Sequence, residues 1–92
     1  MSFLSEIIPT KKELVLNLDK LHTTELGIKR IKRNLCLNLE DVVLWCKQQI
    51  IKSNSYAVRK GKNWYINIGN YEIIVNVYSY TIITAYRAKY KI

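Results

Sequence analysis

The spacing of the hydrophobic residues changes from a helical to a strand period near residue 53, and this change restricts the fold more than any other feature. Before it, apolar residues recur every three to four positions, as in helices that lie on a core. After Asn54, apolar and polar residues alternate, as in strands with one buried face. No linker, repeat or low-complexity tract interrupts the 92 residues, so we expect a single domain over 1–92.

Three helices are predicted before the change. Their ranges are about 10–21, 24–34 and 39–52. Thr10 and Glu13 have the spacing of a capping box at the start of the first. Thr23 or Thr24 can cap the second, and Gly27 within it would allow a close approach of backbone.

The third predicted helix begins after the capping residue Asn38 and is apolar around most of its circumference. Leu44, Trp45 and Ile51 widen a stripe that would otherwise be narrow. A helix of this kind is packed on more than one side. We therefore expect it to be the central helix of the domain.

Four strands are predicted after the change, at about 56–59, 63–68, 71–78 and 81–90. Gly69 and Asn70 form a two-residue hairpin signal between the second and third. Strict alternation in the last strand would place Ile82, Thr84 and Tyr86 on one face. The predicted fold is α+β, with three N-terminal helices packed on one face of a C-terminal four-stranded antiparallel meander.

The charge of the chain indicates which partners it favours. Fifteen Lys and Arg residues oppose seven Asp and Glu, a net charge of +8, which favours RNA or another polyanion. No apolar run reaches membrane-spanning length and no signal peptide is recognisable, so we expect a cytoplasmic protein without a membrane partner. Hydrophobic residues make up 49 % of this short chain, which leaves a protein partner or a homodimer open.

The cysteines and the single histidine do not have the spacing of a metal site. Cys36 and Cys46 are separated by nine residues, and one histidine cannot complete a zinc site with them. We expect no metal and no cofactor. Two buried thiols are the simplest interpretation, and a disulfide is the alternative.

Basic and aromatic residues alternate along the predicted strands and cover one face of the second helix. Such a combination suits phosphate contacts and the stacking of unpaired bases. The alternative is a solvated helix face beside tyrosines that are ordinary strand formers. The candidate nucleic-acid-binding residues are Lys29, Arg30, Lys32, Arg33, Lys60, Lys62, Asn63, Tyr65, Thr84 and Arg87.

His22 is the natural candidate for acid–base chemistry, since histidine titrates near neutral pH. Cleavage of RNA at a 2′-hydroxyl without a metal needs a base, an acid and a cation beside the phosphate. His22, Arg59 and Tyr86 are the candidate catalytic residues. The alternative is that His22 ends a helix and binds a backbone group.

Three strings of the sequence resemble a family of small uncharacterised bacterial proteins with paired NWY and ITA motifs. They are LHTTELGIKRI at 21–31, GKNWY at 61–65 and YSYTIITA at 78–85. The resemblance covers about residues 14–88 and implies no activity. More loosely, the element order and the Thr84-x-Tyr86 pattern are similar to the barnase/EndoU/colicin/RelE ribonuclease superfamily, which implies phosphate contacts from strand cations.

The sequence therefore predicts a small basic RNA-binding protein, with a metal-independent, toxin-type endoribonuclease as its enzymatic form. The alternative is a protein-binding inhibitor or adaptor of the phage or mobile-element type without catalytic activity. The sequence leaves open whether the chain is an enzyme.

Overall fold

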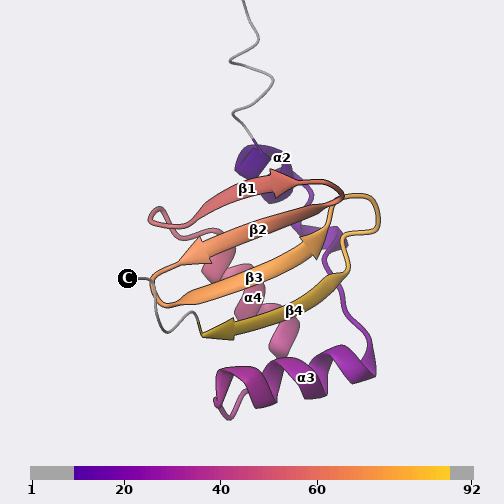
Figure 1. Ribbon diagram of the computed structural model, residues 1–92, viewed down its shortest axis with the longest axis vertical. Helices are drawn as coiled ribbons and strands as arrows, with labels where there is room; N and C mark the ends of the chain where they lie inside the picture. Colours follow the sequence, from indigo (N-terminus) through magenta and orange to yellow (C-terminus); the bar gives the residue numbers. More distant parts are fainter. Residues whose placement is uncertain (1–9, 88–92) are drawn as a thin grey trace, which may run out of the picture.

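The alternating residues of the second half form one antiparallel sheet, as expected. The computed structural model describes residues 10–87, and the sheet order follows the chain as β1-β2-β3-β4 (Figure 1). The strands are β1 (Tyr56–Lys60), β2 (Asn63–Ile68), β3 (Tyr71–Asn76) and β4 (Ile82–Arg87). Positions 88–90 of the predicted last strand lie outside the described residues.

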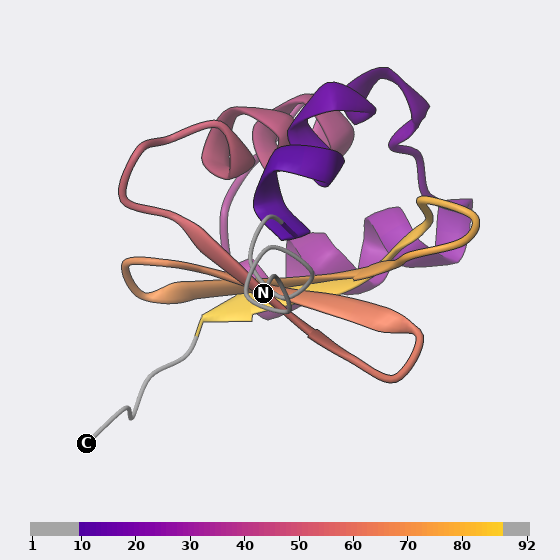
Figure 2. The same ribbon diagram turned by 90° about the horizontal axis from the view of Figure 1, so that it is seen from above.

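The helices lie on one side of this sheet (Figure 2). They are α2 (Thr10–Leu16), the 3₁₀ turn η1 (Leu18–Lys20), α3 (Glu25–Leu35) and α4 (Val42–Ile50). Helix α2 packs against the edge strand β1, α4 packs against β2, and α3 packs against the other edge strand, β4. Helices before a meander sheet make the chain an α+β protein, and no helix within residues 10–87 lies on the opposite face of the sheet.

The core lies between the helices and the sheet. Trp64, Ile66 and Ile73 are almost fully buried from the sheet, and Ile31 and Leu35 from α3. The sequence predicted the two central strands, β2 and β3, because both bury every second residue. None of the helices within residues 10–87 is long and apolar enough to cross a membrane.

The predicted first helix is interrupted. It ends at Leu16, and a 3₁₀ turn over Leu18–Lys20 follows. The Asn17 side chain donates a hydrogen bond to the carbonyl of Glu13 at 3.0 Å, and Leu16 is largely exposed. Side-chain bonds of this kind compete with a continuing helix. The side chain of Thr10, the predicted cap, lies outside the described residues.

The third helix is shorter than predicted and starts later. Asp41, rather than Asn38, caps it by accepting a hydrogen bond from the Leu44 amide at 3.0 Å. Leu44 and Ile51 are about half exposed. The prediction that apolar residues pack on more than one side of this helix was therefore wrong at these two positions.

A β-bulge corrects the predicted faces of β4. Ile73 pairs with Ala85 and Ile74 with Thr84, but Val75 pairs with Ile82, so Ile83 is the extra residue. Ile82 consequently faces the helices, while Thr84 faces the opposite side. Strict alternation placed these two residues on one face and was wrong here.

Candidate nucleic-acid interface

We call the sheet face opposite helices α2, α3 and α4 the open face, and it presents three rows of side chains. Strand pairing defines each row, since directly paired residues point to the same side. The polar row is Tyr56, Asn67, Glu72 and Tyr86. The apolar row is Val58, Tyr65, Ile74 and Thr84. The basic row is Lys60, Asn63 and Asn76.

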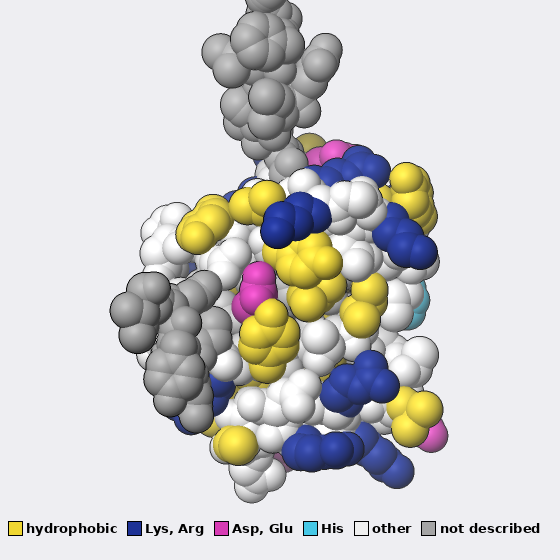
Figure 3. All heavy atoms as spheres, in the orientation of Figure 1, with side chains coloured by type: hydrophobic (Ala, Val, Ile, Leu, Met, Phe, Trp, Pro, Cys, Tyr) yellow, Lys and Arg dark blue, Asp and Glu magenta, His cyan; other side chains and the backbone are white. Residues whose placement is uncertain are grey.

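Figure 3 views this face directly and shows hydrophobic side chains across its middle, with basic side chains above and below them. Tyr56 is 59 % exposed and Val58 43 % exposed, while Tyr65 and Ile74 are half-buried among their neighbours. Flat, partly exposed aromatic and apolar groups of this kind offer stacking surface to unpaired bases.

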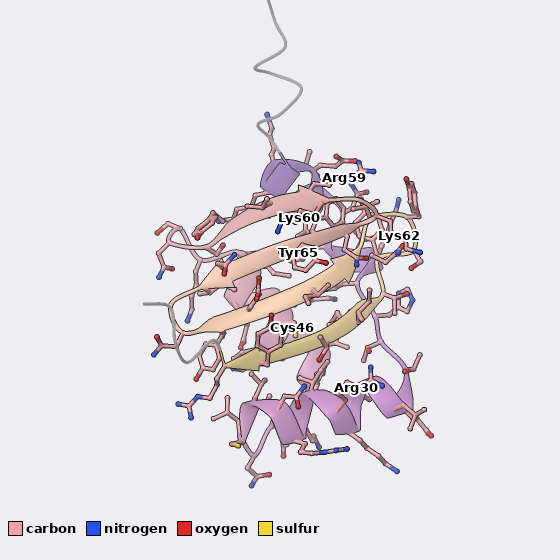
Figure 4. The ribbon with its side chains drawn as sticks, viewed as in Figure 1. Arg30, Cys46, Arg59, Lys60, Lys62 and Tyr65 are labelled. Carbon is pink, nitrogen blue, oxygen red and sulfur yellow. The ribbon has the colours of Figure 1, made fainter. Side chains whose placement is uncertain are left out.

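Lys60 brings a positive charge to the upper part of this surface. Its ammonium lies 5.6 Å from the centre of the Tyr65 ring, a cation–π contact (Figure 4). Asn63 is its partner across the β1–β2 pair, and the Asn63 Oδ1 atom is buried without a hydrogen-bond partner among the described residues. The Lys60 ammonium thus lies over the Tyr65 ring, which places a cation that could bind phosphate next to an aromatic surface.

Glu72 and Tyr86 pair directly across β3 and β4 in the polar row. The Tyr86 hydroxyl donates a hydrogen bond to Glu72 Oε1. This bond, followed by burial and by the charge of Glu72, raises the pKa of Tyr86 to about 12. The Tyr86 hydroxyl is therefore a hydrogen-bond donor to Glu72.

Helix α3 extends the open face beyond β4. The side-chain amide of Asn34 donates to the Thr84 hydroxyl at 3.1 Å, so the flank of α3 that carries Asn34 borders the open face. Arg30 is one turn earlier on the same flank, and Figure 4 shows it between α3 and β4. Arg30 thus supplies a cation at the edge opposite Lys60.

The side chains of the other three α3 cations point away from the open face. At about 100° per residue, Lys32 lies on the side of the helix opposite Asn34. Lys29 and Arg33 point outward, and all three are exposed. The sequence analysis grouped the four α3 cations together, but of these four Arg30 alone borders the open face.

Arg59 and Lys62 lie at the end of the sheet, by the β1–β2 turn. Arg59 donates to the Gly61 carbonyl at 3.1 Å and to the Tyr78 hydroxyl at 3.4 Å. Lys62 is exposed, and its carbonyl accepts a hydrogen bond from the Val77 amide at 2.9 Å. Arg87 is exposed at the end of β4 and pairs with Tyr71.

His22 joins the loop before α3 to the start of β4. Its Nδ1 atom lies 2.9 Å from the Lys20 carbonyl and its Nε2 atom 3.1 Å from the Thr81 hydroxyl. The carbonyl can only accept, so Nδ1 donates to it, while Nε2 and the Thr81 hydroxyl share a hydrogen bond. The His22 amide donates to the Tyr80 carbonyl and the His22 carbonyl accepts from the Ile82 amide, so His22 and Thr81 form an isolated parallel bridge.

The structure does not bring the three candidate catalytic residues together. His22 lies beside Thr81 and Ile82, whereas Tyr86 is four residues further along β4, about 13 Å at the usual rise per residue. Arg59 is on β1, at the other edge of the sheet. Both ring nitrogens of His22 are engaged within the fold.

Sequence reasoning missed Glu72, Ile74 and Asn34 as members of this surface. The strand period could have placed Ile74 beside Tyr65, because both alternate with buried residues. The pairing of Glu72 with Tyr86 depends on the bulge in β4, and the contact of Asn34 with Thr84 spans 50 positions. No local pattern signals either contact.

The cysteines occupy two environments. Cys46 is fully buried, and burial raises the pKa of its thiol to about 12. Cys36 is exposed at the end of α3, and both thiols are free. The prediction of two buried thiols was correct for Cys46 and wrong for Cys36. Among residues 10–87, no group of three or more His, Cys, Asp and Glu side chains is placed to hold a metal ion.

A family model described as "Protein of unknown function (DUF3781)" matches residues 15–86, from α2 into β4. The chain belongs to this family, which confirms the predicted membership of an uncharacterised family. No curated protein and no solved structure matches the chain. The similarity to the ribonuclease superfamily stays a prediction.

Proposed function

We propose that the protein binds single-stranded RNA on the open face of its sheet. The observation that supports this most is the apolar row, with Tyr65 at its centre, between Lys60 at one edge and Arg30 at the other. An unpaired base can stack on the row while its phosphates approach these cations. The net charge of +8 adds long-range attraction for any polyanion.

We propose binding without cleavage. The Tyr86 hydroxyl is bound to Glu72, and both nitrogens of His22 have backbone or side-chain partners. Acid–base catalysis needs its acid and its base within hydrogen-bond reach of one substrate, and His22 and Tyr86 are several strand positions apart.

Fluorescence anisotropy with a labelled RNA of about 12 nucleotides tests this proposal. The single strand should bind, with an affinity that falls as salt rises. The same strand annealed to its complement should bind more weakly, because paired bases cannot stack on Tyr65. Equal affinity for both forms would contradict the proposal, and a denaturing gel with chelator present would detect cleavage.

A protein partner is the second candidate, and the outer side of α4 favours it. Leu44 and Ile51 are two helical turns apart, and each is about half exposed. Two exposed apolar residues on one side of a helix suit a protein interface better than a polyanion. Substituting both with glutamate should then abolish a stoichiometric complex and lower RNA affinity only slightly, through the added negative charge.

A further inference from the structure

Glu72 places a carboxylate on the open face, where the proposed function requires phosphate binding. It is the acidic member of the three rows, and its half-buried carboxylate lies between Asn67 and Tyr86. A carboxylate repels phosphate groups, so its presence weakens general binding of RNA. A hydrogen-bond acceptor of this kind suits instead the donor groups on the edge of a base.

The Glu72 carboxylate is close enough to the apolar row to contact the edge of a base that stacks on this row. Glu72 and Ile74 are two positions apart on β3, about 7 Å along the strand. Ile74 pairs with Tyr65. A base stacked there has one edge toward Glu72, while its sugar and phosphate extend toward the basic row and Lys60.

Building on the proposed function, we propose that Glu72 makes the open face selective for unpaired guanine. Guanine presents two adjacent donors, N1–H and the N2 amino group, which match the two oxygens of a carboxylate. Adenine and cytosine offer a single amino donor beside an acceptor nitrogen, and uracil offers one N–H between two carbonyl oxygens. The acceptors on these three bases face the carboxylate unfavourably.

Tyr86 acts as a positioning residue in this arrangement. Its hydroxyl occupies one lone pair of Glu72 Oε1 and fixes the orientation of the carboxylate. An ionised carboxylate has about four acceptor positions, so both oxygens keep capacity for guanine. The raised pKa of Tyr86 keeps this donor protonated.

The test measures the affinity of single-stranded RNAs that differ only in one central base, guanine, inosine, adenine, cytosine or uracil, within an otherwise uridine strand. Guanine should bind about tenfold more tightly than adenine or uracil. Inosine lacks the N2 amino group and should fall between them. Glu72→Gln should remove the guanine preference and raise affinity for the other strands, since it removes a negative charge.

Glu40→Gln is the matched control, because it removes the same charge from an exposed residue before α4. It should raise all affinities slightly and keep the guanine preference. A circular dichroism melt of each variant checks the fold.

The outcomes separate the two proposals. Equal affinity for all five strands would overturn the role of Glu72 and leave RNA binding intact. A guanine preference that survives Glu72→Gln would also overturn it. Absence of binding to every strand at low salt would overturn both.

Discussion

The hydroxyl of Thr23 donates a hydrogen bond to the backbone carbonyl of Ile82 at 2.8 Å, joining residues 59 positions apart. The same hydroxyl lies only 2.2 Å from the place where a Cβ atom at Gly27 would be. The Thr23 hydroxyl thus links the loop before α3 to the start of β4. The same hydroxyl leaves room only for glycine at position 27, in the first turn of α3.

Gly27→Ala should therefore destabilise the protein, although alanine is the better helix former. The added methyl group collides with the Thr23 hydroxyl, so either that hydrogen bond or the helix must shift. We expect a loss of about 1–3 kcal/mol in the free energy of unfolding, measured by urea denaturation.

A double-mutant cycle identifies the cause of that loss. In a Thr23→Ala background the hydroxyl is absent, so Gly27→Ala should cost much less than in the original chain. An equal cost in both backgrounds would show that the Thr23 hydroxyl is not the obstacle.

Cys36 ends α3 in the left-handed conformation, with φ of 58°. A side chain in this region costs about 1–2 kcal/mol, and Cys36 is exposed. Cys36→Gly should raise the free energy of unfolding by about 1 kcal/mol, while Cys36→Ala should leave it nearly unchanged. If both substitutions had the same effect in urea denaturation, the strain assigned to this position would be wrong.

The bond between Tyr86 and Glu72 predicts a stability change at alkaline pH. The pKa of Tyr86 is raised to about 12 in the folded chain, against about 10 in an unfolded one. The protonated phenol is favoured by folding, so its contribution is complete below pH 10 and is lost as the pH rises toward 12. Solvent screening keeps this contribution below about 1 kcal/mol.

Tyr86→Phe removes the titrating group and should flatten the fall in melting temperature over this alkaline range. Below pH 10 the variant should melt somewhat lower than the original chain, because Glu72 has lost a donor. Parallel curves for both proteins from pH 9 upward would contradict the assignment.

The centre of the sheet was predictable because β2 and β3 bury every second residue. Trp64, Ile66 and Ile68 alternate with partly exposed residues, and this local pattern sets both the element and its buried face. The cap of α3 was predictable as Thr23 or Thr24, and the structure shows that Thr24 accepts the hydrogen bond from the Gly27 amide at 3.0 Å.

The candidate site was less predictable because long-range contacts decide it. The bulge at Ile83 changes which side chains of β4 share a face. The contact between Asn34 and Thr84 selects Arg30 from the four α3 cations. The hydrogen bonds of His22 to Lys20 and Thr81 likewise depend on the folded loop. Such relations follow from the packing of α3 along β4 rather than from any local sequence pattern.

The most direct test of RNA binding on the open face compares two tyrosine substitutions by anisotropy. Tyr65 is central in the apolar row, whereas Tyr78 is 73 % exposed in the loop before β4 and outside the three rows. Tyr65→Ala should weaken binding of single-stranded RNA about tenfold or more. Tyr78→Ala should leave the affinity within about twofold. Equal losses, or no loss with Tyr65→Ala in a protein whose fold is intact by circular dichroism, would contradict the proposed site.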